Sequence, residues 1–178
     1  GAFFPESEFT FVIGNPLVVS GVTYEHVLGH VFWGAMIGLG TLSIRYIILG
    51  GSFAIFLDSD HLLQFLEIEL VSRMSHSLPF AVIVSIVFLI ILRGKDIRIC
   101  VVAFAAVLSH IAFDVFLAHI AFNSFTKFPL FSPFTFETVS LQGLDWLVIQ
   151  IVGVSLVAIT SYFYKRKEIK LKDNLTKT

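Results

Sequence analysis

The sequence predicts an all-α, polytopic membrane protein of about five transmembrane helices, and composition and segment length lead to this prediction. Apolar residues make up 56% of the 178-residue chain and charged residues only 14%, whereas soluble domains carry about 25% charged residues. Several apolar runs approach the roughly 20 residues that a helix needs to cross a bilayer. The same composition argues against a disordered chain, a nucleic-acid-binding module and, with a single cysteine, a disulfide scaffold.

Five apolar segments, separated by short polar stretches, account for the predicted helices. The second is the shortest, and it suits either a tilted span with local bilayer thinning or a re-entrant piece. The first contains several glycines at helical spacing, which allow another helix to approach closely in lipid. The segments are 24–42, 44–57, 78–92, 99–122 and 144–164, and together they form a single membrane domain, 1–164.

Basic residues cluster at two places that fall on the same side of this topology. Half of the 12 Lys and Arg residues follow residue 164, and three more lie in the polar turn 93–98. Because Lys and Arg favour the cytoplasmic side of short membrane-flanking segments, we expect a multi-pass protein of the cell membrane with a basic cytoplasmic tail, 165–178. The N-terminal segment, 1–23, is then expected outside, provided that 44–57 crosses the bilayer.

Two pairs of polar residues at i,i+4 spacing interrupt the apolar segments. His26 and His30 share one helix face, where two imidazoles can hold a divalent metal; alternatively, they are interfacial histidines bonded to loop carbonyls. Of the two, His30 is the predicted ligand. His110 and Asp114 lie within the fourth segment, where an unpaired carboxylate in lipid is costly, so Asp114 needs a cationic or metal partner. The alternative for this pair is a hydrogen bond between helices.

Two further polar motifs stand next to apolar segments. Asp58, Asp60 and His61 follow the second segment and combine carboxylate and imidazole ligands at one point; the alternative is a solvated polar turn that ends the helix. Arg73 and His76 precede the third segment. Arg73 is either a clamp for an anionic group or an interfacial anchor, while His76 is expected to bind metal or transfer protons.

The stretch 125–136 is rich in phenylalanine and contains two prolines that prevent a regular helix. Two interpretations are open for this stretch. Either the loop lies on the outer interface and caps the polar cluster, or it is a packed connection between helices.

In the predicted topology, most ligand-type residues fall in one layer on the outer side of the membrane. His119 is the exception, because it lies half a turn out of phase with His110. The predicted cofactor is a divalent metal, zinc in the first place and manganese or iron as alternatives. The predicted metal ligands are His30, Asp58, Asp60, His61, His76, His110 and Asp114, and the predicted catalytic residues are Asp58, Asp60, His76 and Arg73.

The order and spacing of these motifs resemble the membrane-bound metal-dependent hydrolase family of bacteria and archaea, which includes a LexA-binding inner-membrane protein classed as a hydrolase. The resemblance covers roughly residues 26–136 and implies a small helical membrane protein with a His/Asp metal centre. The chain departs from the family pattern before His76, where Ser72-Arg73-Met74 stands in place of His-Arg-Gly. The motifs that carry the resemblance are His30-x-x-x-Gly34, Asp58-x-Asp60-His61, Ser75-His76-Ser77, His110-x-x-x-Asp114, Phe128-Pro129-Leu130 and Pro133-Phe134.

The leading functional hypothesis is a membrane-embedded, metal-dependent hydrolase of a phosphoester or lipid-like substrate at the outer leaflet. The alternative is a non-catalytic structural or accessory subunit of a membrane complex, whose polar cluster binds metal or joins helices. An ion or proton pathway is disfavoured because the inner halves of the predicted helices contain almost no ionisable residues. Expected partners are the lipid bilayer, a lipid-like substrate and a partner subunit, and no nucleic acid is expected.

Overall fold

The computed structural model describes residues 23–57 and 71–176, together with the side chains of this part except those of 71–73 and 122. Five α-helices, one 3-10 helix and two short strands make up the described part, and the predicted helical character is confirmed. In chain order the elements are α2 (Tyr24–Leu39), α3 (Ile44–Leu57), η2 (Val71–His76), α4 (Leu78–Ile91), α5 (Ile97–Phe122), β1 (Thr126–Phe128), β2 (Val139–Leu141) and α6 (Asp145–Leu175).

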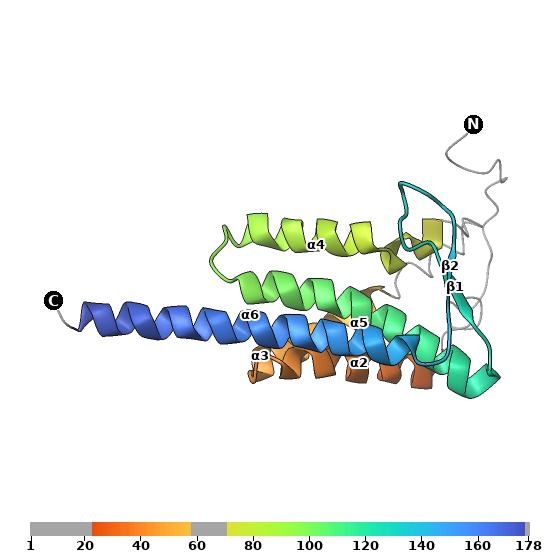
Figure 1. The fold of residues 1–178 in the computed structure, drawn as a ribbon, viewed down its shortest axis with the longest axis horizontal. Helices are drawn as coiled ribbons and strands as arrows, with labels where there is room; N and C mark the ends of the chain where they lie inside the picture. The colour runs from red at the N-terminus through yellow and green to blue at the C-terminus, as the bar shows by residue number, and fades with distance from the viewer. Residues whose placement is uncertain (1–22, 58–70, 177–178) are drawn as a thin grey trace.

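Helix α5 is the centre of the bundle. It packs against α2, α3, α4 and α6, and Figure 1 shows it running alongside α4 and α6. Its buried face carries several small side chains, among them Ala103, Ala105, Ala106 and Ala112. Small side chains allow neighbouring helix backbones to come close, which is how helices pack where no hydrophobic effect drives them together.

Glycines bring α2 and α3 into backbone contact. A Cβ atom on Gly34 would collide with the carbonyl group of Gly50, and one on Gly50 would collide with the carbonyl oxygen of Gly34. The turn between the two helices is held by Thr41, whose side chain donates to the carbonyl of Gly38 (2.8 Å) and accepts from the amide of Ser43 (3.1 Å). The hairpin therefore depends on the lack of a side chain at Gly34 and Gly50 as well as on the hydrogen bonds of Thr41.

A cluster of charged and aromatic side chains joins three helices at the basic end of the bundle. The guanidinium of Arg98 donates two hydrogen bonds to Asp96 (2.9 and 3.2 Å) and lies over the ring of Tyr164, 4.0 Å from its centroid. The hydroxyl of Tyr46 also donates to Asp96. Burial alone would raise the pKa of Asp96, but the hydrogen bonds from Arg98 and Tyr46 hold it below its ordinary value.

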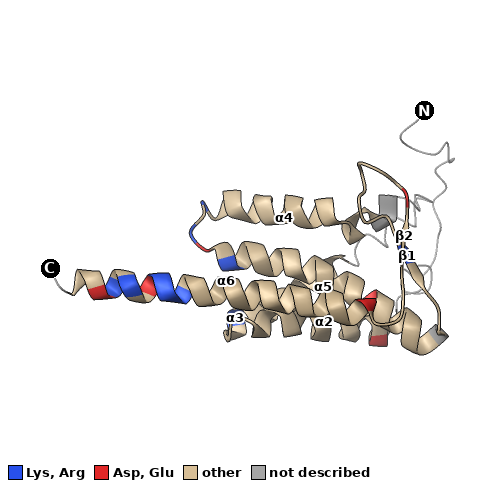
Figure 2. Ribbon diagram, in the orientation of Figure 1, with Lys and Arg blue, Asp and Glu red and all other residues tan. Residues whose placement is uncertain are grey.

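The charged residues are distributed unevenly along the bundle. Figure 2 shows Lys and Arg at the end where α4 meets α5 and along the last part of α6, with acidic residues of α2 and α6 near the opposite end. Lys165 also donates to the carbonyl of Thr41 (3.2 Å), which fastens α6 to the turn between α2 and α3. The two predicted basic clusters thus lie at one end of the structure.

Helix α6 is longer than the predicted segment 144–164. It continues without a break to Leu175, so that residues 165–175 extend the helix beyond the bundle (Figure 1). Lys, Arg, Glu and Leu dominate this extension and are all strong helix formers, which explains why the helix does not end where its apolar part ends.

Two of the described helices are long and apolar enough to cross a bilayer, namely 97–121 within α5 and Asp145–Leu175. Helices α2, α3 and α4 have 16, 14 and 14 residues, which is below the roughly 20 residues of an untilted span. The membrane-protein character of the chain is supported, whereas the five-span topology stays a prediction.

The short strands were not predicted. β1 pairs with β2 in antiparallel register, with Lys127 opposite Ser140. Strands of three residues are too short to show a measurable alternation of polar and apolar residues, so the sequence pattern does not reveal them.

Replacing Gly50 tests the contact between α2 and α3. We expect Gly50→Ala to lower the free energy of unfolding by about 1–3 kcal/mol, because the added methyl group forces the two backbones apart. Ser52→Ala, on an exposed position of the same helix, is the matched control and should leave stability unchanged. Thermal unfolding of the detergent-solubilised variants measures both, and equal midpoints for the two would contradict the close packing.

Candidate metal centre

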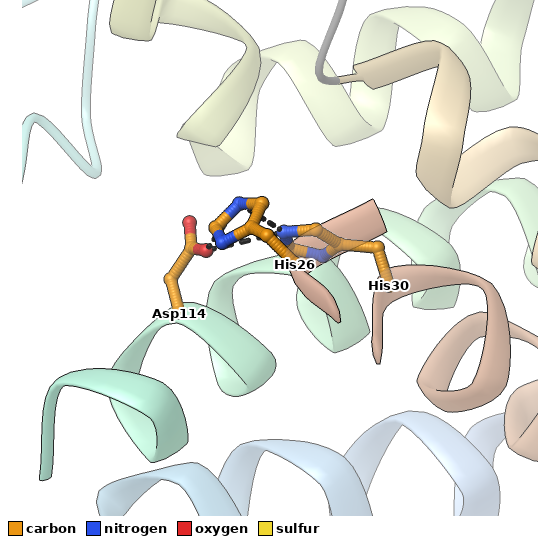
Figure 3. A group of neighbouring side chains, drawn as sticks. All are labelled: His26, His30 and Asp114. Atoms are coloured by element: carbon orange, nitrogen blue, oxygen red, sulfur yellow. Dashed lines mark hydrogen bonds and ion pairs between the residues drawn. The ribbon is translucent and has the colours of Figure 1, made fainter. Parts of the chain in front are cut away.

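Three elements bring four histidines and one aspartate together. His26 and His30 lie one turn apart on α2, His76 ends η2, and His110 and Asp114 lie one turn apart on α5. Figure 3 shows the two imidazoles of α2 directed toward the carboxylate of Asp114. The i,i+4 spacing explains this arrangement, because it places each pair on a single face of its helix.

The carboxylate of Asp114 is the centre of the cluster. Its Oδ1 lies 3.2 Å from Nε2 of His30 and 3.7 Å from Nε2 of His26. Its Oδ2 lies 3.3 Å from Nε2 of His76 and 3.8 Å from Nε2 of His110. Each carboxylate oxygen therefore faces its own pair of imidazoles.

Within each pair the imidazole nitrogens are close. Nε2 of His26 lies 3.0 Å from Nε2 of His30, and Nε2 of His76 lies 2.9 Å from Nε2 of His110. Two nitrogen lone pairs at such a distance repel one another, so each pair needs a proton or a cation between its members.

The outer nitrogens of two rings are held by neighbouring groups. Nδ1 of His110 lies 3.2 Å from the carbonyl oxygen of Ala54, and Nδ1 of His76 lies 3.0 Å from Oγ of Ser75. Because a carbonyl only accepts, Nδ1 of His110 carries the hydrogen, and Nε2 of the neutral ring presents its lone pair to the cluster. Metal-binding histidines are oriented by the same kind of outer hydrogen bond.

The cluster is enclosed on most sides. His30, His76 and His110 are buried, whereas the side chains of Asp114 and His26 remain 15% and 20% exposed, so the cluster opens on their side. Phe113 packs edge-on against His30, with ring centroids 4.7 Å apart.

The phenylalanine-rich stretch lies against the cluster through one buried side chain. The ring of Phe128 stacks on His76, with centroids 5.7 Å apart and an angle of 17° between the rings. The carbonyl of Leu130 accepts a hydrogen bond from the amide of Leu78 (2.9 Å), which ties the stretch to the start of α4. Of the two interpretations, the one in which this stretch covers the polar cluster agrees with these contacts.

An apolar groove of about 540 Å³ lies beside the cluster, between α2 and α6. Phe32, Trp33, Phe116, Trp146 and Gln150 are among the residues that line it. The ring of Trp33 contacts that of Phe113, with centroids 5.8 Å apart, and Phe113 in turn packs against His30. Within the described part of the chain, Oε1 of Gln150 and Nε1 of Trp146 are buried without a hydrogen-bond partner.

The structure brings together four of the seven predicted ligands: His30, His76, His110 and Asp114. Asp58, Asp60 and His61 lie outside the described residues, and Arg73 lies in η2 with a side chain that is also outside them. His26 belongs to the cluster although it was not in the predicted ligand set. Its spacing from His30 was the signal for it. His119 is in neither of the candidate metal groups among the described residues.

The donor set fits a divalent metal ion. The candidate ligand atoms in each of two groups lie within 4.8 Å of one another, one group comprising His26, His30 and Asp114 and the other His76, His110 and Asp114. Imidazole nitrogens and a carboxylate oxygen are the ligands of zinc and related transition metals.

The model of the YdjM inner membrane protein family matches residues 23–173 of the chain. The chain belongs to this family. The match extends over both groups of candidate ligands and supports the predicted membrane location, while metal dependence and hydrolysis stay predictions. No protein of curated function and no solved structure matches the chain.

The contact between Phe128 and His76 leads to a prediction about the cover of the cluster. Phe128→Ala should lower the free energy of unfolding by about 3–5 kcal/mol, because it leaves a cavity over the imidazole, and should make His76 more reactive toward diethyl pyrocarbonate. Phe134→Ala removes a ring of the same stretch that is 85% exposed and serves as the control. Thermal unfolding and peptide mass spectrometry measure both effects. The contact is refuted if the two variants behave alike.

Proposed function

We propose that this protein is a membrane-embedded, metal-dependent hydrolase of a phosphoester or lipid-like substrate. The observation that carries the proposal is the convergence of four imidazoles on the carboxylate of Asp114. Polar groups buried among apolar helices are costly, and they are typically retained where they serve a function. The fixed ring orientation of His110 and His76 adds to this support.

The chemistry of the donors favours zinc over manganese. Four imidazoles and one carboxylate form a nitrogen-rich set, which suits zinc, whereas manganese prefers more oxygen ligands. Asp58, Asp60 and His61 would complete the ligand set in this proposal.

A divalent ion in such a site makes water acidic enough to supply a nucleophile near neutral pH and polarises the oxygen under attack. The residues of the chain orient and balance this chemistry. Asp114 offsets positive charge at the centre, and a carboxylate of Asp58 or Asp60 that does not bind metal would act as general base, with His76 as a further group able to transfer protons. Arg73 would neutralise the negative charge of the substrate.

The groove beside the centre supports a lipid-like substrate. Its walls are aromatic and aliphatic, and its length follows α6 from Trp146 toward Val154. An acyl chain placed there would bring its polar end to the level of Trp33, one turn beyond His30 on α2.

A second candidate function is that of a non-catalytic accessory subunit of a membrane complex. It is favoured by the part of α6 that extends beyond the bundle, where Ile169 and Leu171 are exposed on either side of Lys170. In that case the polar cluster would bind metal, or join helices, without turnover.

Removing one imidazole tests metal binding. We expect the purified wild-type protein to contain zinc in stoichiometric amounts. We expect His110→Ala to weaken zinc binding by the group of His76, His110 and Asp114 by at least about 100-fold, more than the 10–100-fold typical of an outer-shell change. His119→Ala lies on the same helix outside the cluster and should retain the metal. Metal content is measured by mass spectrometry on membrane-inserted protein. If the wild type and both variants contain no zinc, manganese or iron, the proposal is wrong and the accessory role is favoured instead.

The orientation in the membrane is also part of the proposal: a multi-pass protein with the basic end and the C-terminus in the cytoplasm. Single cysteines can report it once the native Cys100 is replaced by alanine. We expect Glu137→Cys to react with a membrane-impermeant maleimide in intact cells and Lys167→Cys to react only after the cells are opened. The opposite pattern would reverse the topology.

A further inference from the structure

We infer that the centre binds two divalent ions and that the carboxylate of Asp114 bridges them. The inference rests on the metal-binding part of the proposed function, because a cluster that holds no metal cannot hold two ions.

The donors divide into two groups that share one residue. Among the described residues, one group contains both imidazoles of α2, the other contains His76 and His110, and Asp114 is the member common to both. Oδ1 faces the first group and Oδ2 faces the second. A carboxylate that presents one oxygen to each of two sets of imidazoles has the connectivity of a bridging ligand.

The distances inside each group suit one ion. Zinc binds imidazole nitrogen at about 2.0–2.1 Å in tetrahedral geometry, which places the ligand atoms roughly 3.3 Å apart. The observed nitrogen pairs are 3.0 and 2.9 Å apart, and the nearest carboxylate oxygens lie at 3.2 and 3.3 Å. Each group therefore already has nearly the spacing of a bound triad.

Ring stacking places the two positions in neighbouring planes. His30 and His110 belong to different groups, yet their rings are parallel within 13° and their centroids are 3.8 Å apart. An ion bound by Nε2 lies in the plane of its ring, so two ions held by these stacked rings lie in nearly parallel planes that are no farther apart than the ring centroids. Two-metal hydrolytic sites have ions about 3.5–4 Å apart.

The charge of such a centre selects the class of substrate. Four neutral imidazoles and one carboxylate leave two divalent ions with a large excess of positive charge among the described donors. An anion with two oxygens able to contact both ions offsets this charge, and paired ions are used for displacement at phosphorus. The preferred substrate class is accordingly a phosphoester, and inorganic phosphate should bind as its simplest analogue.

Metal counting tests the inference on the full chain in detergent or nanodiscs. After loading with zinc and removal of free ions, we expect two ions per chain for the wild type and for His119→Ala, and one for His26→Ala. His26 is partly exposed, so its removal should leave the bundle folded. His110→Ala should also retain one ion, held by the group on α2.

Manganese provides an independent readout of the bridge. The protein loaded with Mn²⁺ should show the electron paramagnetic resonance spectrum of an exchange-coupled pair, and His26→Ala should show that of a single ion. Inorganic phosphate should change the spectrum of the wild type and bind the single-ion variant at least tenfold more weakly. Equal phosphate binding by both proteins would overturn the assignment of substrate class.

The outcomes of metal counting separate this inference from the proposed function. One ion per chain in the wild type, or two uncoupled manganese ions, would overturn the bridged pair and leave a mononuclear hydrolase standing. No metal in the wild type would overturn both.

Discussion

The structure depends on one constraint, which is the carboxylate of Asp114 inside an apolar bundle. Asp114 lies on α5, the helix that contacts all the other α-helices of the described chain. A carboxylate in such surroundings is stable only if other groups compensate its charge and its lost hydration. The compensating groups are the imidazoles of α2 and η2 together with His110 one turn away. At this end of the bundle, α2, η2 and α5 therefore meet around Asp114, because they carry the imidazoles that compensate its charge.

The packing of small residues is what lets these partners reach Asp114. Gly34 and Gly50 bring the backbones of α2 and α3 together, which sets the position of the helix that carries His26 and His30. On α3, one turn after Gly50, the carbonyl of Ala54 accepts a hydrogen bond from His110. A larger side chain in this region would change the geometry of the cluster as well as the stability of the bundle, so the cluster and the core form one cooperative unit.

Much of the fold follows from the sequence, and the limits have physical causes. Apolar length locates α3 and α5 almost to the residue, because apolar runs bounded by polar turns have little freedom in lipid. The cost of burying Asp114 also predicts partners for it. Helical spacing, however, shows only which residues share a helix face. It does not show which of them reach a residue on a neighbouring helix, so His26 was left out of the predicted ligand set. The end of α6 was missed because strong helix formers continue the helix after apolar residues cease.

Charged residues have different roles at the two ends of the bundle, and this difference relates the orientation in the membrane to the position of the metal centre. At one end, Arg98 is held by Asp96 and by the ring of Tyr164, and Lys165 is bonded to Thr41, so the cations serve to fasten helices. At the other end, the imidazoles gather around a single carboxylate and remain partly open through His26. Lys and Arg residues at one end of the bundle favour the placement of that end on the cytoplasmic side of the membrane. In the orientation that we propose, the metal centre then lies toward the outer leaflet, so that metal ions and phosphoester lipids would reach it from that side.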